Sequence, residues 1–390
     1  MAEDFRTELS DAVNALPAAD WESLVAATPG ATPFQRHVWL SALEQSGCVG
    51  AETGWQPVVV SLRDASGALA AACALYVKSH SYGEYVFDWA WARAYAEHGL
   101  PYYPKLLLAV PFTPVGGAKL LGRDATARKA LLGEILAIAR RSGFNSLHAL
   151  FLDPQEAQWC SALGLLERTT LQFHWRNPPA EGGAVWPDFE AFIGSLRHDK
   201  RKKIKQEQRQ VRDAGVCFRA LVGTEITESH WDFFTRCYQT TYALHGSDPY
   251  LNRAFFQTIG AQMPEHCLLF IAERDGQPVA SSLVLLDPQS RIAYGRYWGA
   301  VAHIPALHFD ACYYQPIAWC LAHGYTTFEG GAQGEHKMAR GLQPVATRSA
   351  HWLAQPQFSR AVEDYLERES AALAEHQNSL QERLPFKEVQ

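Results

Sequence analysis

The sequence predicts an α/β protein with mixed α+β sheets, built from two similar halves. The segment GLLERTTLQFHW (residues 164–175) matches GLQPVATRSAHW (residues 341–352) at 5 of 12 positions, with an offset of 177 residues. The elements that precede each copy recur in the same order. At 390 residues the chain also exceeds the size at which one hydrophobic core keeps growing. We therefore expect a duplicated unit.

Each half is expected to contain a hairpin, a strand, a helix, a strand, a helix and a strand. The hairpin turns are predicted at residues 64–67 and 275–276, where Asp, Ser and Gly provide turn geometry. Helical stretches at residues 130–143 and 311–324 follow, and each precedes a short β-branched or aromatic run. An amphipathic helix over residues 33–45 is predicted before the first hairpin.

The first domain is predicted to span residues 1–176 and the second residues 188–357. Between them, residues 177–187 (NPPAEGGAVWP) are rich in Pro and Gly, which is typical of a linker. The remaining stretch, residues 358–390, has apolar residues at helical spacing on a Glu-rich background as far as Leu384. This pattern predicts a C-terminal surface helix.

The composition indicates an ordinary globular protein, with 47% hydrophobic and 19% charged residues. Because the net charge is −6, any contact with a polyanion has to be local. The eight Cys are scattered singly, which favours reduced, mostly buried thiols. The N-terminus has no hydrophobic signal region, and the most apolar run, residues 106–110, is far too short to span a bilayer. We expect a cytoplasmic protein without a transmembrane segment.

Three polar stretches of the second half are candidates for a functional site. They are YGRYWG (residues 294–299), HFDACYYQ (residues 308–315) and EGGAQGEHKMARG (residues 329–341). They are expected at the end of a strand, the start of a helix and the loop after the next strand, positions that meet at one edge of an α/β sheet. The third stretch is rich in Gly, which allows backbone amides to approach a ligand closely.

These stretches, with RKKIKQEQRQVRDAG (residues 201–215) and the 341–352 repeat, resemble the FemAB-like branch of the GNAT acyltransferase superfamily. The resemblance extends over residues 33–386. It implies two tandem GNAT-like domains with a C-terminal helix, in agreement with the duplication. It also implies an N-acyltransferase that transfers an acyl or aminoacyl group to an amine of a peptide, amino-acid or cell-wall-precursor substrate. Better-studied relatives take the aminoacyl group from tRNA.

One departure from the superfamily concerns the acyl donor. Acetyl-CoA-dependent GNAT enzymes bind the pyrophosphate with an R/Q-x-x-G-x-G/A turn at a helix N-terminus. The corresponding segments here, PVGGAKLLG (residues 114–122) and AVAHIPALHF (residues 300–309), lack that turn. An aminoacyl-tRNA donor stays compatible with the sequence, and acyl-CoA as a co-substrate is the alternative. No metal site and no tightly bound cofactor is implied.

A basic helix predicted over residues 188–212, ended by Gly215, is the candidate tRNA or phosphate site. Between Arg197 and Arg212 there are eight Lys or Arg against two acids. A solvated helix and pairing of ions between domains are the alternatives for this run. The residues assigned to tRNA or phosphate binding are Lys200, Arg201, Lys202, Lys203 and Lys205.

Transfer of an acyl group to an amine needs a polarised carbonyl, a neutral amine and a proton acceptor. Glu329 or Glu335 is expected to accept the proton, and Lys337 or Arg340 to stabilise the oxyanion or a donor phosphate, with His336 suited to either role. A structural hydrogen-bond network around the Gly loop is the alternative. The residues assigned to substrate binding are Asp88, Trp91, Tyr103, Lys105, Arg296, Tyr297, Trp298, His308, Asp310, Tyr313 and Tyr314.

The second half is thus expected to carry the transfer chemistry and the first half to help hold the acceptor. Two other functions stay open at this point. One is an acyl-CoA-dependent N-acetyltransferase whose pyrophosphate loop has diverged. The other is a non-catalytic protein that binds a cell-wall or amino-acid ligand in the same cleft.

Overall fold

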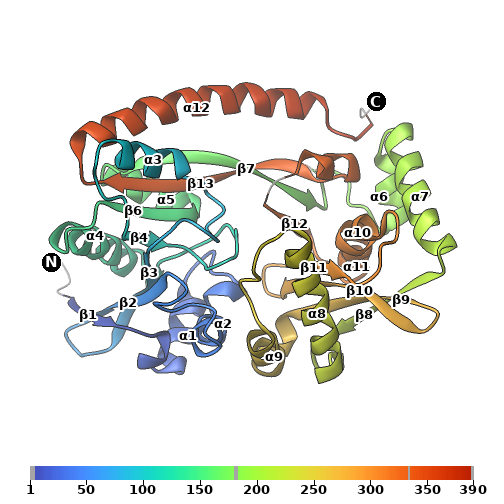
Figure 1. Ribbon diagram of the computed structural model, residues 1–390, viewed down its shortest axis with the longest axis horizontal. Coiled ribbons are helices and arrows are strands. Elements are labelled where there is room, and N and C mark those ends of the chain that lie inside the picture. Colours follow the sequence, from blue (N-terminus) through green and yellow to red (C-terminus); the bar gives the residue numbers. More distant parts are fainter. Residues whose placement is uncertain (1–4, 180–182, 333, 388–390) are drawn as a thin grey trace. The chain divides into compact units, whose positions relative to one another are not determined.

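The computed structural model describes residues 5–179, 183–332 and 334–387, and the chain divides into two compact units. Unit 1 comprises Met1–Thr170 and Ala346–Glu375, and unit 2 comprises Leu171–Val345 and His376–Gln390. Each unit is a mixed sheet covered by helices (Figure 1). The predicted fold class, α/β with two tandem units and a C-terminal helix, is confirmed.

The sheet of unit 1 has the strand order β1, β2, β3, β4, β6 and the end of β13, with β5 paired to β3. Its strands are β1 (Arg6–Ser10), β2 (Trp55–Arg63), β3 (Leu69–Lys78), β4 (Lys105–Leu108), β5 (Leu121–Gly122), β6 (Ser146–Leu152) and the first part of β7 (Leu166–Arg176). Its helices are α1 (Ala18–Ala27), α2 (His37–Gln45), α3 (Trp89–Glu97), α4 (Ala125–Arg141) and α5 (Pro154–Ala162).

The core of unit 1 lies between the sheet and α4. Asp124 begins this helix by accepting a hydrogen bond from the Ala127 amide at 2.9 Å, which satisfies one of the free N–H groups of the first turn. Leu131, Leu132 and Ile135 recur at helical spacing, are all buried, and pack against β2, β3 and β6. The helix is therefore held by its apolar face.

The sheet of unit 2 has the strand order β8, β9, β10, β11, β12 and the end of β7. Its strands are β8 (Val216–Val222), β9 (Cys267–Arg274), β10 (Gln277–Asp287), β11 (Ile292–Ala300), β12 (Thr327–Ala332) and the first part of β13 (Gln343–Leu353). Its helices are α6 (Phe189–Ser195), α7 (His198–Asp213), α8 (Glu228–Leu244), α9 (Arg253–Gln262), α10 (Leu307–Phe309), the π-helical Asp310–Tyr314, α11 (Gln315–Ala322) and the 3-10 helix Glu335–Arg340.

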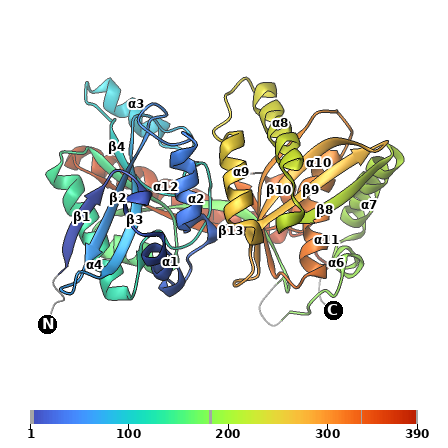
Figure 2. The same ribbon diagram turned by 90° about the horizontal axis from the view of Figure 1, so that it is seen from below.

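The helices of unit 2 cover both faces of its sheet, with α8 on one side of β8 to β10 and α11 on the other (Figure 2). Gly299 in β11 allows α8 to pack closely. A Cβ at this position would lie 1.9 Å from the carbonyl oxygen of Cys237 in α8, so a side chain there is sterically excluded.

The two units exchange their last strands. The end of β7, which belongs to the first half of the sequence, pairs with β12 in unit 2, and the end of β13 pairs with β6 in unit 1. The exchanged strands contain the two matching 12-residue segments. His174 lies opposite Glu329, and His351 lies opposite His148, so the repeats occupy equivalent positions in the two sheets.

The exchange makes the compact units discontinuous in sequence, whereas the domains predicted at 1–176 and 188–357 are contiguous stretches. A strand that pairs inside the other half cannot be recognised from its own residues, because its periodicity is that of any half-buried strand. Of the predicted linker, residues 177–187, positions 180–182 lie outside the described residues. Asn177 and Trp186, on either side of them, are joined by two hydrogen bonds of 2.8 and 3.0 Å.

Two predicted helices are each divided. The helix expected over residues 188–212 consists of α6 and α7, because Leu196 is extended and forms a β-bridge with Phe386. The helix expected over residues 33–45 begins as a 3-10 turn at Pro33–Gln35 and continues as α2. The predicted turn at residues 64–67 is confirmed, with Asp64 Oδ1 accepting from the Ser66 and Ala68 amides.

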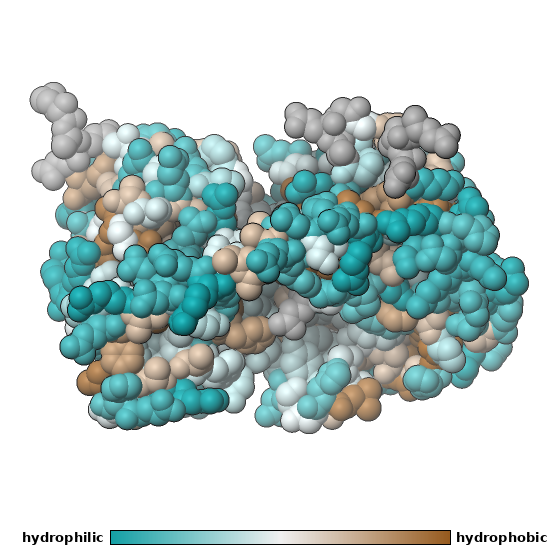
Figure 3. All heavy atoms as spheres, turned by 90° about the horizontal axis from the view of Figure 1, so that it is seen from above, coloured by the Kyte–Doolittle hydropathy of each residue, from teal (hydrophilic) through white to brown (hydrophobic). Residues whose placement is uncertain are grey.

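The C-terminal helix is confirmed as α12 (Pro356–Glu382), which runs without interruption for 27 residues. Hydrophilic residues predominate on the face of the molecule that carries it (Figure 3). In the part of the chain that the structure describes, neither this helix nor any other combines the length and apolar character needed to cross a bilayer.

Candidate functional site

Glu329 and Arg296 lie where β11 and β12 stop pairing. Over the described residues these parallel strands pair only as far as Tyr294 opposite Glu329. A β-bulge follows in β11, where Arg296 has no pairing partner in β10. The bulge changes the direction of the Arg296 side chain. The Arg296 Nη2 atom donates to Glu329 Oε2 at 3.0 Å, and both side chains are at least nine-tenths buried. The ion pair thus marks the point at which the two parallel strands separate.

His174 completes what we call the Glu329 cluster (Glu329, Arg296 and His174). Its Nδ1 atom lies 3.9 Å from Glu329 Oε1, and its Nε2 atom lies 3.2 Å from Gln172 Oε1. Burial lowers the pKa of His174, while the Glu329 carboxylate acts in the opposite direction. The cluster therefore places a neutral imidazole and a guanidinium beside one buried carboxylate.

Lys337 holds the Gly-rich loop next to this cluster. Its Nζ atom donates to the carbonyl oxygens of Gly331 at 3.1 Å and Ala332 at 3.0 Å. Gly331 has φ 76°, a left-handed conformation that Gly adopts without strain. Burial lowers the pKa of Lys337 to about 8, and the Arg296 charge acts in the same direction. Lys337 thus stabilises the loop through hydrogen bonds, and its ammonium group interacts electrostatically with Arg296 of the Glu329 cluster.

Arg340 is fixed by a second group of residues, which we call the Arg340 cluster (Arg340, Glu207, Tyr314, Phe309 and His336). Its Nη2 atom donates to both oxygens of Glu207, at 2.9 and 3.1 Å, and its Nη1 atom donates to the His336 carbonyl at 2.8 Å. Its guanidinium lies 3.5 Å from the centre of the Phe309 ring. Tyr314 donates its hydroxyl hydrogen to Glu207. The Arg340 guanidinium is therefore held at its edge by hydrogen bonds to Glu207 and His336, and at its face by the Phe309 ring.

The histidines of the site lie around Tyr313. The Tyr313 hydroxyl is 3.4 Å from His336 Nε2, and the His308 ring lies 5.8 Å from the Tyr313 ring and 5.2 Å from the Trp298 ring. Burial lowers the pKa of His308 to about 4, and the charges of His336, Arg340 and Lys337 act in the same direction. Burial also lowers the pKa of His336. Both imidazoles are therefore favoured in the neutral form.

The π-helical turn Asp310–Tyr314 directs neighbouring tyrosines to different partners, Tyr313 to His336 and Tyr314 to Glu207. Asp310 is buried and accepts from Gln315 Nε2 at 2.9 Å. Burial raises its pKa to about 6.

The other two predicted residues of unit 2 are oriented differently. Glu335 is half exposed, and its carboxylate lies 3.2 Å from His376 in α12 and 3.9 Å from Arg383. Tyr297 packs against Tyr238 and Phe256, with ring centres 5.5 and 6.1 Å apart. The structure therefore brings Glu335 to the C-terminal helix and Tyr297 to the α8 side of the sheet.

The basic run forms one wall of a groove between α6 and α7. The cavity has a volume of about 780 Å³ and is lined by Glu190, Gly194, His198, Arg201, Lys202, Lys205, Gln206 and Arg209. Lys205 lies 2.9 Å from Glu190 and stays about half exposed. Of the five predicted tRNA or phosphate ligands, Lys200 and Lys203 do not line the groove, and Lys200 pairs with Asp199 at 2.9 Å.

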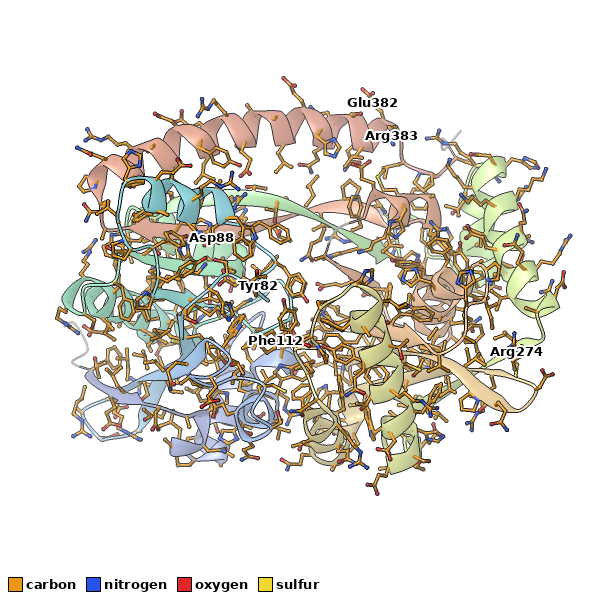
Figure 4. All side chains as sticks on the ribbon, viewed as in Figure 1. Tyr82, Asp88, Phe112, Arg274, Glu382 and Arg383 are labelled. Atoms are coloured by element: carbon orange, nitrogen blue, oxygen red, sulfur yellow. The ribbon has the colours of Figure 1, made fainter. Side chains whose placement is uncertain are left out.

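The four predicted residues of unit 1 lie together in a buried polar cluster. Lys105 Nζ donates to Asp88 at 2.5 Å and to Glu84 at 2.8 Å, and both carboxylates are almost fully buried (Figure 4 labels Asp88). Burial alone would lower the pKa of Lys105, but Glu84 and Asp88 outweigh it and raise the pKa. Tyr103 lies 2.8 Å from Ser81, and the Trp91 ring contacts the His351 ring. The ammonium group is thus already occupied by protein ligands.

This cluster continues to the position equivalent to Glu329. The Tyr102 hydroxyl donates to Asp88 at 2.6 Å and lies 3.1 Å from His148 Nε2. The Nδ1 atoms of His148 and His351 are 2.7 Å apart, so one ring donates and the other accepts. Burial lowers the pKa of His148 to about 3. Unit 1 therefore has a neutral imidazole where unit 2 has a carboxylate.

A protein carboxylate occupies two backbone amides that immediately precede β5. Glu156 is fully buried and accepts from the amides of Lys119 (3.0 and 2.9 Å) and Leu120 (2.8 Å), and from Arg128 Nη2 (2.8 Å). Adjacent backbone amides beside a guanidinium are donors of the kind that bind an anion. Residues 114–122, which lack the pyrophosphate turn in sequence, thus include two amides that a protein carboxylate already satisfies.

Two residues of the site were not recognised from the sequence. Glu207 counted only as one of two acids in a basic run, although Ile204, Glu207 and Val211 share the buried face of α7. That spacing is the signal that could have identified it. His174 could not be found from the sequence, since only the exchange of strands brings it opposite Glu329. Among the described residues, no group of three or more His, Cys, Asp or Glu side chains has a geometry that would hold a metal ion.

Comparison with known proteins identifies a family and a set of structures with the same fold. Residues 12–388 match the FemAB-like family model, described as peptidoglycan biosynthesis/recognition. No curated protein gave a significant match.

Two solved structures align over most of both chains. The C-terminal domain of a protein assigned as a lysylphosphatidylglycerol synthetase from Agrobacterium fabrum aligns with a TM-score of 0.52 at 12% identity, over 89% of this chain and 96% of that chain. L-PGS from Bacillus licheniformis aligns with a TM-score of 0.52 at 11% identity, over 90% and 97%. At these identities the likeness shows the fold alone.

Proposed function

Because the chain belongs to the FemAB-like family, we propose that it is an N-acyltransferase that moves an aminoacyl group from tRNA to an amine of a peptide, amino-acid or cell-wall-precursor substrate. The observation that carries the proposal is the Glu329 cluster, a buried carboxylate between a guanidinium and a neutral imidazole at the point where β11 and β12 of unit 2 separate. The proposal places the reaction in the cytoplasm, where charged tRNA is available.

The chemistry assigns a role to Glu329, Arg296 and Lys337. The acceptor amine attacks the ester carbonyl of the aminoacyl-tRNA, a C–N bond forms, and the bond to the terminal ribose oxygen breaks. The proton lost by the amine passes to Glu329 and returns to the leaving ribose oxygen. Arg296 keeps Glu329 in place, and the Lys337 ammonium is the nearby positive charge that favours the oxyanion.

The basic groove supports a tRNA donor over acyl-CoA. Five of its lining residues are Lys, Arg or His against one Glu, in a protein whose net charge is −6. Such a local concentration of positive charge fits a polyphosphate backbone. In unit 1, the Glu156 carboxylate satisfies the amides before β5, which argues against a CoA pyrophosphate at that place.

A transfer assay with competing donors tests the proposal. The protein is mixed with bulk tRNA charged with a labelled amino acid, or with labelled acetyl-CoA, and with an amine-bearing peptide of a peptidoglycan precursor. We expect label in the peptide from tRNA only. Label from acetyl-CoA only would establish the acyl-CoA-dependent N-acetyltransferase instead. Saturable binding of the peptide without transfer from either donor would establish the non-catalytic binding protein.

A further inference from the structure

Helix α7 carries different chemistry on its two sides. One side presents Arg201, Lys205 and Arg209, at intervals of four residues, to the basic groove. The other side buries Ile204, Glu207 and Val211 against the rest of unit 2. Glu207 is the only acid on that buried side, and only 7% of it is exposed.

The Glu207 carboxylate accepts three hydrogen bonds, two from Arg340 Nη2 and one from the Tyr314 hydroxyl. Arg340 in turn donates to the main chain of His336 at 2.8 Å. The Glu207 carboxylate is therefore held firmly in place, because moving it would break its buried hydrogen bonds with Arg340 and Tyr314 at once. These hydrogen bonds therefore fix the position of the Glu335–Arg340 turn relative to α7.

We propose that Glu207 is a positioning residue for the transfer site. It orients Arg340 and, through Arg340, the His336 segment, and it does so from the helix whose other face forms the donor groove. The inference rests on the proposed function, in which α7 binds the donor. Glu207 itself contacts neither donor nor acceptor, so it should affect the rate of transfer and leave donor binding intact.

The test is the Glu207→Gln variant, which keeps the size of the side chain and removes its charge. The Arg340 guanidinium then lacks its counter-charge, and its positive field at His336 increases. We expect the pKa of the His336 imidazole to fall, as followed by NMR of labelled histidine with a His336→Gln variant for assignment. The kcat of transfer should fall by about 10- to 100-fold, because the Glu335–Arg340 turn, which carries Lys337, is displaced. The KM for charged tRNA and the affinity for uncharged tRNA should change less than about 2-fold.

Two further variants separate positioning from folding. Glu156→Gln breaks another buried Glu–Arg pair, that of Glu156 with Arg128 in unit 1, and should leave both the His336 titration and kcat per folded molecule unchanged. The double variant Glu207→Gln with Arg340→Gln removes both charges, so its thermal midpoint should recover relative to Glu207→Gln. Its kcat should stay low. If the single variant does not fold, the double variant carries the test.

A Glu207→Gln protein with an unchanged His336 titration would overturn the inference, and so would a double variant that recovers the wild-type kcat. Wild-type protein without transfer activity would instead reject the proposed function. In that event the His336 titration still decides whether Glu207 positions the segment.

Discussion

Arg296 and Glu329 form an ion pair of 3.0 Å in unit 2, with only 2% and 9% of their side chains exposed. Breaking one side of such a pair leaves a buried charge without compensation. We expect Arg296→Leu to lower the free energy of unfolding by about 3–5 kcal/mol, measured by urea denaturation. Adding Glu329→Leu should restore most of that loss. A double variant no more stable than Arg296→Leu would show that the pair does not act as one unit.

The buried His148 predicts acid sensitivity of unit 1. Its pKa in the folded protein is lowered to about 3, chiefly by burial, whereas the unfolded chain has the ordinary value of 6.5. The unfolded state therefore binds the extra proton between these values, and this contribution to stability is present above pH 6.5 and lost as the pH falls toward 3. The slope is about 1.4 kcal/mol per pH unit for one proton.

Replacing His148 with Gln should reduce proton uptake on unfolding by about one between pH 6.5 and 3, as measured by denaturation across that range. The exposed His303→Gln variant serves as the control and should keep the wild-type slope. An unchanged slope in the His148 variant would assign the acid sensitivity to other groups.

The basic groove predicts salt-dependent binding of tRNA. Each phosphate contact contributes roughly 0.7 to 0.9 to the slope of log affinity against log salt. Replacing Arg201, Lys202 and Lys205 with Ala should flatten that slope by about two to three and weaken binding of uncharged tRNA. The matched control removes Lys129, Arg140 and Arg141, three exposed cations of α4 in unit 1, and should bind like wild type. Equal salt slopes in the two triple variants would show that the groove does not bind tRNA phosphates.

Glu156 predicts rescue by an anion. Glu156→Ala leaves the Lys119 and Leu120 amides and Arg128 around an empty, positively polarised space. We expect its thermal midpoint to rise more with added inorganic phosphate than that of wild type, because the anion binds only the folded state. If both proteins respond equally to phosphate, these donors do not form an anion site.

The duplicated architecture could be predicted because the two 12-residue repeats lie at one register in two equivalent sheets, with His174 and His351 at matching positions. The exchange of these strands could not, since a strand carries no mark of the half in which it pairs. The division of the basic helix at Leu196 was equally hidden, because it depends on a bridge to the distant Phe386.

Within the candidate site, local sequence identified Glu329, His336 and Arg340 because they surround a Gly-rich loop. Their partners come from distant segments. Arg296 turns toward Glu329 only because of a β-bulge, and Glu207 reaches Arg340 across 133 residues of sequence. Residue spacing describes only what lies on one element, so contacts of this kind required the folded chain.

The central claim, that Glu329 accepts the proton of the attacking amine, is tested most directly by the single-turnover rate of aminoacyl transfer from charged tRNA to an amine-bearing precursor peptide. Wild type and Glu329→Gln are compared at equal occupancy of tRNA, established by direct binding. We predict that the variant binds tRNA as wild type does and transfers at least about 100-fold more slowly. A folded Glu329→Gln protein that transfers at the wild-type rate would contradict the account.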